Sequence, residues 1–176
     1  MTALVRSRRV DLPVVLSFAV AALALRDVGT FSFLVPLLCA VGVLAVQPRA
    51  VARSDAASWL VVTTIGASVF ALVRIAVPGA TARTTAFALI TSVVAAIAEE
   101  VVFRRGLYGW LERWGAPLAI VMSALAFGVV HAPLYGWTVV PVDAGAGIVL
   151  GWQRWASRTW TSPAVTHAVA NVLGSI

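Results

Sequence analysis

The chain has few charged residues for its length and no lysine at all. Charged residues make up 11% of the 176 residues and the mean hydropathy is +0.96, whereas soluble domains carry roughly 25% charged residues. So few charges cannot cover a surface that faces water on every side, which excludes an ordinary soluble domain. The single cysteine, Cys39, excludes an intrachain disulfide and leaves the cellular compartment unspecified.

All 13 basic residues are arginine, and the net charge is +6. They stand singly or in small groups between apolar segments, which indicates contacts with membrane lipids and no nucleic-acid partner. Counted on alternate sides of those segments, ten arginines share the side of the N-terminus, and Arg26, Arg74 and Arg83 fall opposite. The positive-inside rule then predicts a cytoplasmic N-terminus and seven crossings. The composition, rich in Ala, Val and Arg, is typical of a high-GC bacterium and therefore indicates a bacterial plasma membrane.

Apolar segments alternate with short polar or turn-forming stretches along the whole chain. They lie near 12–25, 31–46, 57–77, 84–103, 116–136, 137–151 and 162–175. A span needs about 20 apolar residues, so the third, fourth and fifth segments are long enough. The first, second and last are short, which leaves tilting, pairing as a hairpin or an interfacial position open. The sequence predicts an all-α polytopic membrane protein with a bundle of about six to seven transmembrane helices around an intramembrane polar cavity.

Scarce polar residues gather in the C-terminal half of the chain. Both histidines, the only asparagine and a pair of adjacent glutamates fall in or at the edge of apolar segments there: Glu99, Glu100, His131, His167 and Asn171. Ionisable groups inside a membrane are costly, so they usually face an interior cavity and serve a function. Glu112 next to Arg113 is typical of a helix end, and Asp143 of a turn.

Helical spacing separates the two adjacent glutamates. Glu100 and Arg104 are four residues apart, acid before base, and are expected to form an ion pair on one helix face. Glu99 is turned away by about 100° and shares a face with Phe103. The spacing therefore predicts a counterion for Glu100 and none for Glu99. Because burial disfavours the charged form of an unpaired carboxylate, Glu99 is the better candidate for a general base or acid.

The turn at Gly115-Ala116-Pro117 is expected to bring Glu99 to a histidine. In an antiparallel helical hairpin centred on residue 115, Glu99 and His131 are each about 16 residues, or roughly 24 Å of helix, from the turn. They should therefore meet across the helix interface if both arms stay helical.

Three short motifs follow one another in order: Glu99-Glu100 with Arg104, Phe127 four residues before His131, and His167 four residues before Asn171. This set resembles the CPBP family of intramembrane proteases, which includes the CAAX prenyl protease type II enzymes and proteins linked to bacteriocin processing. Phe103-Arg104-Arg105-Gly106 is similar to the FRG tail of the first motif, with an extra arginine. The chain is interpreted as one membrane domain, 1–176, in which 84–176 are the catalytic helices and 1–83 are accessory.

The resemblance implies an endopeptidase that hydrolyses a peptide bond of a membrane-associated or lipid-modified peptide substrate. It implies that Glu99 activates a water molecule with help from His131, and that His167 and Asn171 stabilise the oxyanion. Supporting roles fall to Glu100, Arg104, Phe103 and Phe127. No cofactor is expected in this mechanism.

Two alternatives remain open. Glu99, His131 and His167 with a water form a His₂Glu set of the kind found in catalytic zinc sites, although Glu99 would then no longer serve as the base, which favours the metal-free interpretation. The second alternative is a non-proteolytic membrane scaffold or immunity-type protein on the same helices. Since every expected catalytic position is filled, the sequence favours the enzyme. The sequence patterns of other membrane proteases, HExxH, GxGD and GxSG, are absent.

Overall fold

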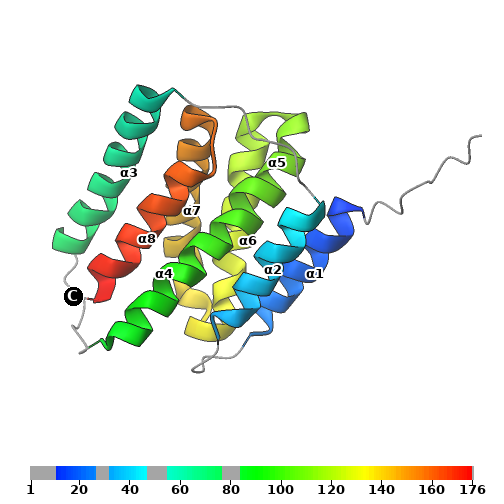
Figure 1. Ribbon diagram of the computed structural model, residues 1–176, viewed down its shortest axis with the longest axis horizontal. Coiled ribbons are helices and arrows are strands. Elements are labelled where there is room, and N and C mark those ends of the chain that lie inside the picture. Colours follow the sequence, from blue (N-terminus) through cyan, green and yellow to red (C-terminus); the bar gives the residue numbers. More distant parts are fainter. Residues whose placement is uncertain (1–10, 27–31, 47–54, 77–83, 176) are drawn as a thin grey trace, which may run out of the picture.

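The computed structural model describes residues 11–26, 32–46, 55–76 and 84–175, and within these ranges the chain forms helices and no strand (Figure 1). The α-helices are α1 (Leu12–Ala24), α2 (Leu34–Val46), α3 (Ala56–Ala76), α4 (Ala86–Glu100), α5 (Tyr108–Leu111), α6 (Ala116–Tyr135), α7 (Val140–Ser157) and α8 (Thr161–Ser175). A π-helical segment, η1 (Val101–Leu107), joins α4 to α5, and the 3-10 turns η2 (Glu112–Trp114) and η3 (Trp137–Val139) flank α6. The predicted all-α class is confirmed.

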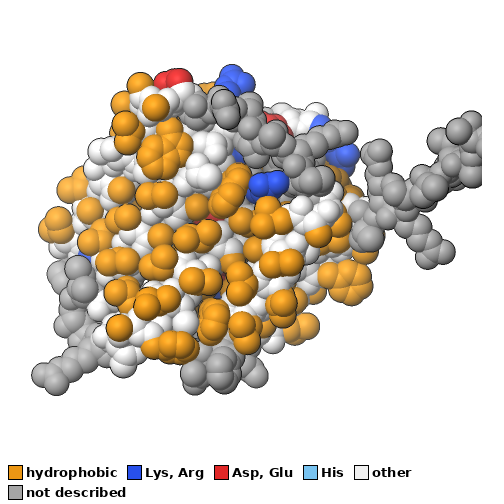
Figure 2. All heavy atoms as spheres, in the orientation of Figure 1, with side chains coloured by type: hydrophobic (Ala, Val, Ile, Leu, Met, Phe, Trp, Pro, Cys, Tyr) orange, Lys and Arg blue, Asp and Glu red, His pale blue; other side chains and the backbone are white. Residues whose placement is uncertain are grey.

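Among the described residues, three helices are long and apolar enough to cross a membrane: α3, the continuous helix Ala86–Trp114 and α6. They correspond to the three segments that the sequence marked as long enough. Large apolar side chains point outward from them, for example Leu72 on α3 and Ile90 on α4, which are 64% and 62% exposed. Figure 2 shows hydrophobic side chains over the middle of one face and most of its charged side chains near the upper edge. Such a surface is typical of helices surrounded by lipid.

The fourth segment continues well past residue 103, where the sequence predicted its end. It runs on through η1 to Trp114. The extra arginine of the Phe-Arg-Arg-Gly stretch falls inside η1, and π-helical turns within α-helices occur frequently at functional sites. Arg104 is completely buried, so it lies inside the bundle and not at the membrane surface where the arginine count had placed it.

Helix α7 also ends later than predicted, at Ser157 instead of near residue 151. Gln153 is fully buried and donates hydrogen bonds to α3 and α8. Arg154 forms an ion pair with Glu112, with nitrogen and oxygen 3.5 Å apart. Because both polar side chains find partners inside the bundle, they do not end the helix.

Helices α6 and α7 pack closely through glycine. A Cβ atom added to Gly147 would lie 2.8 Å from the Cα atom of Ala124, and one added to Gly151 would lie 3.2 Å from the side chain of Ile120. This close packing of small residues brings the start of α7 against the end of α6.

The two short helices α1 and α2 form a hairpin, one of the arrangements that their length left open. Leu16 and Leu23 of α1 and Val43 of α2 share a buried apolar cluster with Val102 of η1 and Phe127 of α6. Arg26, just past the end of α1, therefore lies against the middle of the bundle and not on the opposite membrane side, as the arginine count had assumed. Six arginines of that count, Arg6, Arg8, Arg9, Arg49, Arg53 and Arg83, lie outside the described residues, so the orientation stays a prediction.

Candidate active site

Glu99 of α4 and His131 of α6 meet across the predicted hairpin. The chain reverses at Gly115, whose φ of 109° is a conformation that glycine adopts readily. On the two arms, the Oε2 atom of Glu99 lies 3.8 Å from the Nε2 atom of His131. The expectation that these residues stand level is confirmed, because both arms stay helical.

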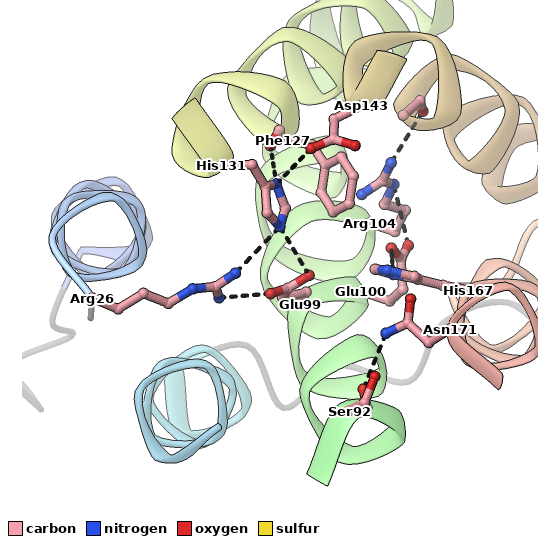
Figure 3. Close-up of polar contacts among 11 residues, drawn as sticks. Arg26, Ser92, Glu99, Glu100, Arg104, Phe127, His131, Asp143, His167 and Asn171 are labelled. Atoms are coloured by element: carbon pink, nitrogen blue, oxygen red, sulfur yellow. Dashed lines mark hydrogen bonds and ion pairs between the residues drawn. The ribbon is translucent and has the colours of Figure 1, made fainter. Parts of the chain in front are cut away.

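Arg26 lies against both of these residues (Figure 3). Its Nη1 atom donates a hydrogen bond to Oε1 of Glu99 at 2.6 Å, and its Nη2 atom lies 3.2 Å from Nε2 of His131. The prediction that Glu99 has no counterion was therefore wrong. Spacing along one helix cannot detect a partner that comes from another helix. The available signal was an arginine between two short apolar segments, since pairing of those segments places it at the tip of a hairpin.

The second ring nitrogen of His131 faces two oxygen atoms. Nδ1 lies 2.8 Å from the carbonyl oxygen of Phe127 and 3.5 Å from Oδ2 of Asp143. A backbone carbonyl only accepts hydrogen bonds, so we assign the proton to Nδ1, which leaves Nε2 of the neutral ring to accept from Arg26. Asp143, read from the sequence as a turn residue, lies in the first turn of α7 beside this histidine.

Glu100 is turned about 100° away from Glu99 and is completely enclosed. Its Oε1 atom lies 3.0 Å from Nδ1 of His167, and its Oε2 atom lies 3.2 Å from Nε of Arg104. The contact with Arg104 is a close approach of opposite charges without the geometry of a hydrogen bond. The predicted ion pair is confirmed, and both side chains are 0% exposed.

Two aromatic rings complete the enclosure of Arg104. Its guanidinium lies 4.8 Å from the ring centre of Phe127 and 5.9 Å from that of Phe103, and its Nη2 atom donates to the carbonyl oxygen of Gly147 at 3.1 Å. The two phenylalanine rings meet edge to face with centres 5.3 Å apart. One buried cluster thus holds the carbonyl of Gly147 and the four residues predicted to support the site, Glu100, Arg104, Phe103 and Phe127.

Helix α8 supplies His167 and Asn171. His167 lies level with Glu100, and its ring centre is 5.5 Å from that of Phe127. The Nδ2 atom of Asn171 donates to the carbonyl oxygen of Ser92 at 3.2 Å. Both side chains line one cavity, as expected for residues four apart on one helix face.

This cavity has a volume of about 690 Å³. The charged, imidazole and amide side chains on its wall are Arg26, Glu99, His131, Asp143, His167 and Asn171, and hydroxyl groups come from Ser32, Thr91, Ser92 and Tyr135. Much of the remaining wall is apolar, with contributions from Phe33, Phe70 and Phe87. Glu100 and Arg104 lie behind the wall and hold His167 in place. The site therefore has a face that reactants can touch and a support that they cannot.

The three residues proposed as zinc ligands do not have a fitting arrangement. In the part of the chain that the structure describes, no three histidine, cysteine or carboxylate side chains form a group suited to a metal ion. The guanidinium of Arg26 contacts both Glu99 and His131, and a cation beside it is electrostatically disfavoured. His167 directs its Nδ1 atom at Glu100. Two acceptor atoms that a metal ion would need, Oε1 of Glu99 and Nε2 of His131, are thus engaged by Arg26.

Comparison with known proteins agrees with the three motifs. A family model described as type II CAAX prenyl endopeptidase, Rce1-like, matches residues 81–173. The matched stretch covers more than half of the chain and contains Glu99, His131, His167 and Asn171, whereas Arg26 lies before it. Searches among curated proteins and among solved structures gave no significant match.

Proposed function

Since the chain belongs to the Rce1-like family of type II CAAX prenyl endopeptidases, we propose that it is an intramembrane endopeptidase that uses Glu99 as its base. The observation that carries this proposal is the pair of Glu99 and His131 on the wall of one cavity, with Nε2 and Oε2 3.8 Å apart. The substrate is a peptide that is membrane-associated or lipid-modified. The chain lies in a plasma membrane with its N-terminus in the cytoplasm.

The first step is activation of a water molecule. A separation of 3.8 Å is too long for a direct hydrogen bond between Glu99 and His131. A water between them can donate to Glu99 and, where it takes the place of the Arg26 N–H, to Nε2 of His131. The Glu99 carboxylate takes a proton from this water, and the water oxygen forms a bond to the peptide carbonyl carbon. The π-electron pair of the carbonyl moves onto its oxygen and gives a tetrahedral oxyanion.

The second step is breakdown of the tetrahedral species. Asn171 and His167 line the same cavity, and hydrogen bonds from the Asn171 amide, and from His167 in its protonated form, would stabilise the oxyanion. The oxyanion electron pair re-forms the carbonyl, the carbon–nitrogen bond breaks, and the proton held by Glu99 passes to the leaving nitrogen. One water and one peptide bond become a carboxylic acid and an amine.

The supporting residues position these groups without touching the substrate. Glu100 orients His167 and is itself held by Arg104, whose guanidinium is enclosed by two phenylalanine rings. Asp143 and the carbonyl oxygen of Phe127 fix the proton of His131 on Nδ1, so that Nε2 faces the cavity as an acceptor.

One contact in the structure and one chemical argument favour a metal-free mechanism. Arg26 places a positive charge against both Glu99 and His131, and it therefore opposes a second cation there. A zinc ion bound by Glu99 would also remove the carboxylate that the mechanism needs as a base.

The test is cleavage of a library of membrane-anchored reporter peptides, with prenylated and unprenylated members. Purified wild type is compared with Glu99→Gln and with Glu112→Gln, a partly exposed glutamate that serves as the matched control. We expect cleavage by wild type and by Glu112→Gln, no cleavage by Glu99→Gln, and no effect of a chelator. Cleavage that stops with chelator and returns with zinc would support the metal-dependent alternative. An intact library after incubation with the wild type would favour a non-proteolytic scaffold.

A further inference from the structure

Arg26 is the one arginine among the described residues that line the cavity. It comes from the N-terminal hairpin, outside the stretch that matches the family model. Its side chain is 8% exposed and contacts both Glu99 and His131. We propose that Arg26 is a further catalytic residue, whose guanidinium stabilises the oxyanion of the tetrahedral intermediate. This inference rests on the proposed peptidase function and deepens it.

The donors on α8 are largely committed to other partners. A carboxylate only accepts hydrogen bonds, so the Nδ1 atom of His167 carries the proton that faces Glu100. In the neutral ring, Nε2 then has no proton to donate. One N–H group of Asn171 is used by the carbonyl oxygen of Ser92. The two α8 side chains thus offer a single free N–H group between them, unless His167 becomes charged.

Arg26 has donors to spare. A guanidinium carries five N–H donors and remains charged at all relevant pH values. The structure shows one donated to Glu99 and one directed at His131. The remaining donors lie beside the atoms that would hold the attacking water. A carbonyl group brought to that water therefore comes within reach of a fixed positive charge.

The movement of charge in the reaction suits this position. When Glu99 takes the proton, its carboxylate becomes neutral and the negative charge appears on the carbonyl oxygen. Arg26 contacts the carboxylate before this transfer and can contact the oxyanion after it. The guanidinium exchanges one anionic partner for another, so the negative charge is never left unpaired in a site of low dielectric.

The α1–α2 hairpin holds Arg26 in place. Leu16 and Leu23 of α1 are at most 4% exposed and pack in the same cluster as Phe127. Helix α1 ends at Ala24, two residues before Arg26. The arginine is therefore positioned by packed helix and not by a free chain end, which is the preorganisation that oxyanion stabilisation requires.

The experiment compares Arg26→Lys and Arg26→Gln with wild type and with a control, Arg74→Gln. Arg74 is a half-buried arginine on α3 that does not line the cavity. Each purified protein is assayed for kcat and KM on a cleaved reporter. Binding of a phosphinic peptide is measured separately by competition with a fluorescent probe. The phosphinic group is tetrahedral and anionic and resembles the intermediate, so its affinity reports contacts that a purely structural residue would not change.

We expect Arg26→Gln to lower kcat by about 10²–10³-fold with KM nearly unchanged, in line with loss of one oxyanion donor. Affinity for the phosphinic peptide should weaken by the same factor as kcat/KM. Arg26→Lys keeps the positive charge but lacks the several N–H donors of the planar guanidinium, so its kcat should lie between those of wild type and Arg26→Gln. Arg74→Gln should match wild type.

Two results would overturn the inference while leaving the peptidase intact. One is a kcat for Arg26→Gln within about threefold of wild type. The other is a lower rate without any weakening of phosphinic-peptide binding. If Arg26→Gln cannot be purified folded, the same comparison on Arg26→Lys decides. A wild type that neither cleaves reporters nor binds the phosphinic peptide would overturn the proposed function, and this inference with it.

Discussion

Glu99 and Glu100 are adjacent in the sequence, but their side chains have different partners and different access to the cavity. Glu99 lines the cavity and contacts Arg26, just past the end of α1, and His131 of α6. Glu100 is fully enclosed behind the cavity wall, against Arg104 and His167. The two side chains point about 100° apart because they are consecutive on one helix. One helical step therefore separates a carboxylate that reactants can reach from one that they cannot.

The comparison shows that one residue type performs two jobs. A base must meet water and substrate and must gain and lose a proton, so it belongs on the cavity wall. A carboxylate enclosed behind the wall can instead hold its neighbours in place, as Glu100 does through its contacts with Arg104 and His167. Substitution at Glu99 should therefore affect rate, and substitution at Glu100 should affect stability first.

The largest expected effect is on the rate of Glu99→Gln. The glutamine amide can still accept a hydrogen bond from Arg26 but cannot take a proton, so kcat should fall by about 10²–10⁴-fold, the usual contribution of a general base. The unfolding midpoint in detergent should stay close to that of wild type, because the site is at the cavity wall. Reporter cleavage and thermal unfolding of the same preparation check both parts. A variant as active as wild type would show that Glu99 is not the base.

Glu100→Gln should give the reverse pattern. It leaves the guanidinium of Arg104 buried without a countercharge, which typically costs about 3–5 kcal/mol of folding free energy. The double substitution Glu100→Gln with Arg104→Met removes both charges and should recover much of the loss. Equilibrium unfolding in mixed micelles measures the folding free energies of the single and the double variant. If the single and double variants are equally unstable, the ion pair is not the cause.

Part of the site could be predicted from the sequence. Helix geometry alone fixes pairs that are four residues apart, such as Glu100 with Arg104 and His167 with Asn171. A tight turn at Gly115 adds the register between two helices, which gave Glu99 with His131.

Asp143 and His131 face each other across the short turn from Gly136 to Val139, which the apolar pattern alone did not mark as a turn. The other missed contacts have a different physical cause. Arg26 with Glu99 and Glu100 with His167 join elements that no tight turn connects in register. Their separation depends on how helices pack, and packing follows from the shape of many side chains together. The fold was easier to predict than the site for the same reason. Long apolar segments identify helices one at a time, but helix ends inside the bundle depend on buried partners, as with Gln153 on α7.

Gly147 and Gly145, both on α7, offer a second comparison, because the packing of α7 on α6 places Asp143 beside His131. Gly147→Ala should destabilise the protein by about 1–3 kcal/mol, the usual cost of overpacking, because the new methyl would lie 2.8 Å from the Cα atom of Ala124. Gly145→Ala is the matched control on the same helix, since a Cβ atom there meets nothing within 4 Å. The thermal unfolding midpoint and the rate of reporter cleavage should both fall for Gly147→Ala and stay unchanged for Gly145→Ala. Equal unfolding midpoints for the two would show that α6 and α7 do not need this close approach.

The smallest expected effect is that of Asp143→Asn. Nδ1 of His131 lies 2.8 Å from the carbonyl oxygen of Phe127 and only 3.5 Å from Asp143, so the carbonyl alone should keep the ring in its tautomer. What is lost is the negative charge beside the imidazole, and we expect kcat to fall by about tenfold, or about 1.4 kcal/mol of transition-state stabilisation. KM and the unfolding midpoint should not change. Steady-state kinetics on one reporter, with Asp143→Ala as a second variant, test this. A loss as large as that of Glu99→Gln would move Asp143 from a positioning role into the chemistry itself, since a residue that only orients His131 should never match the base in its effect.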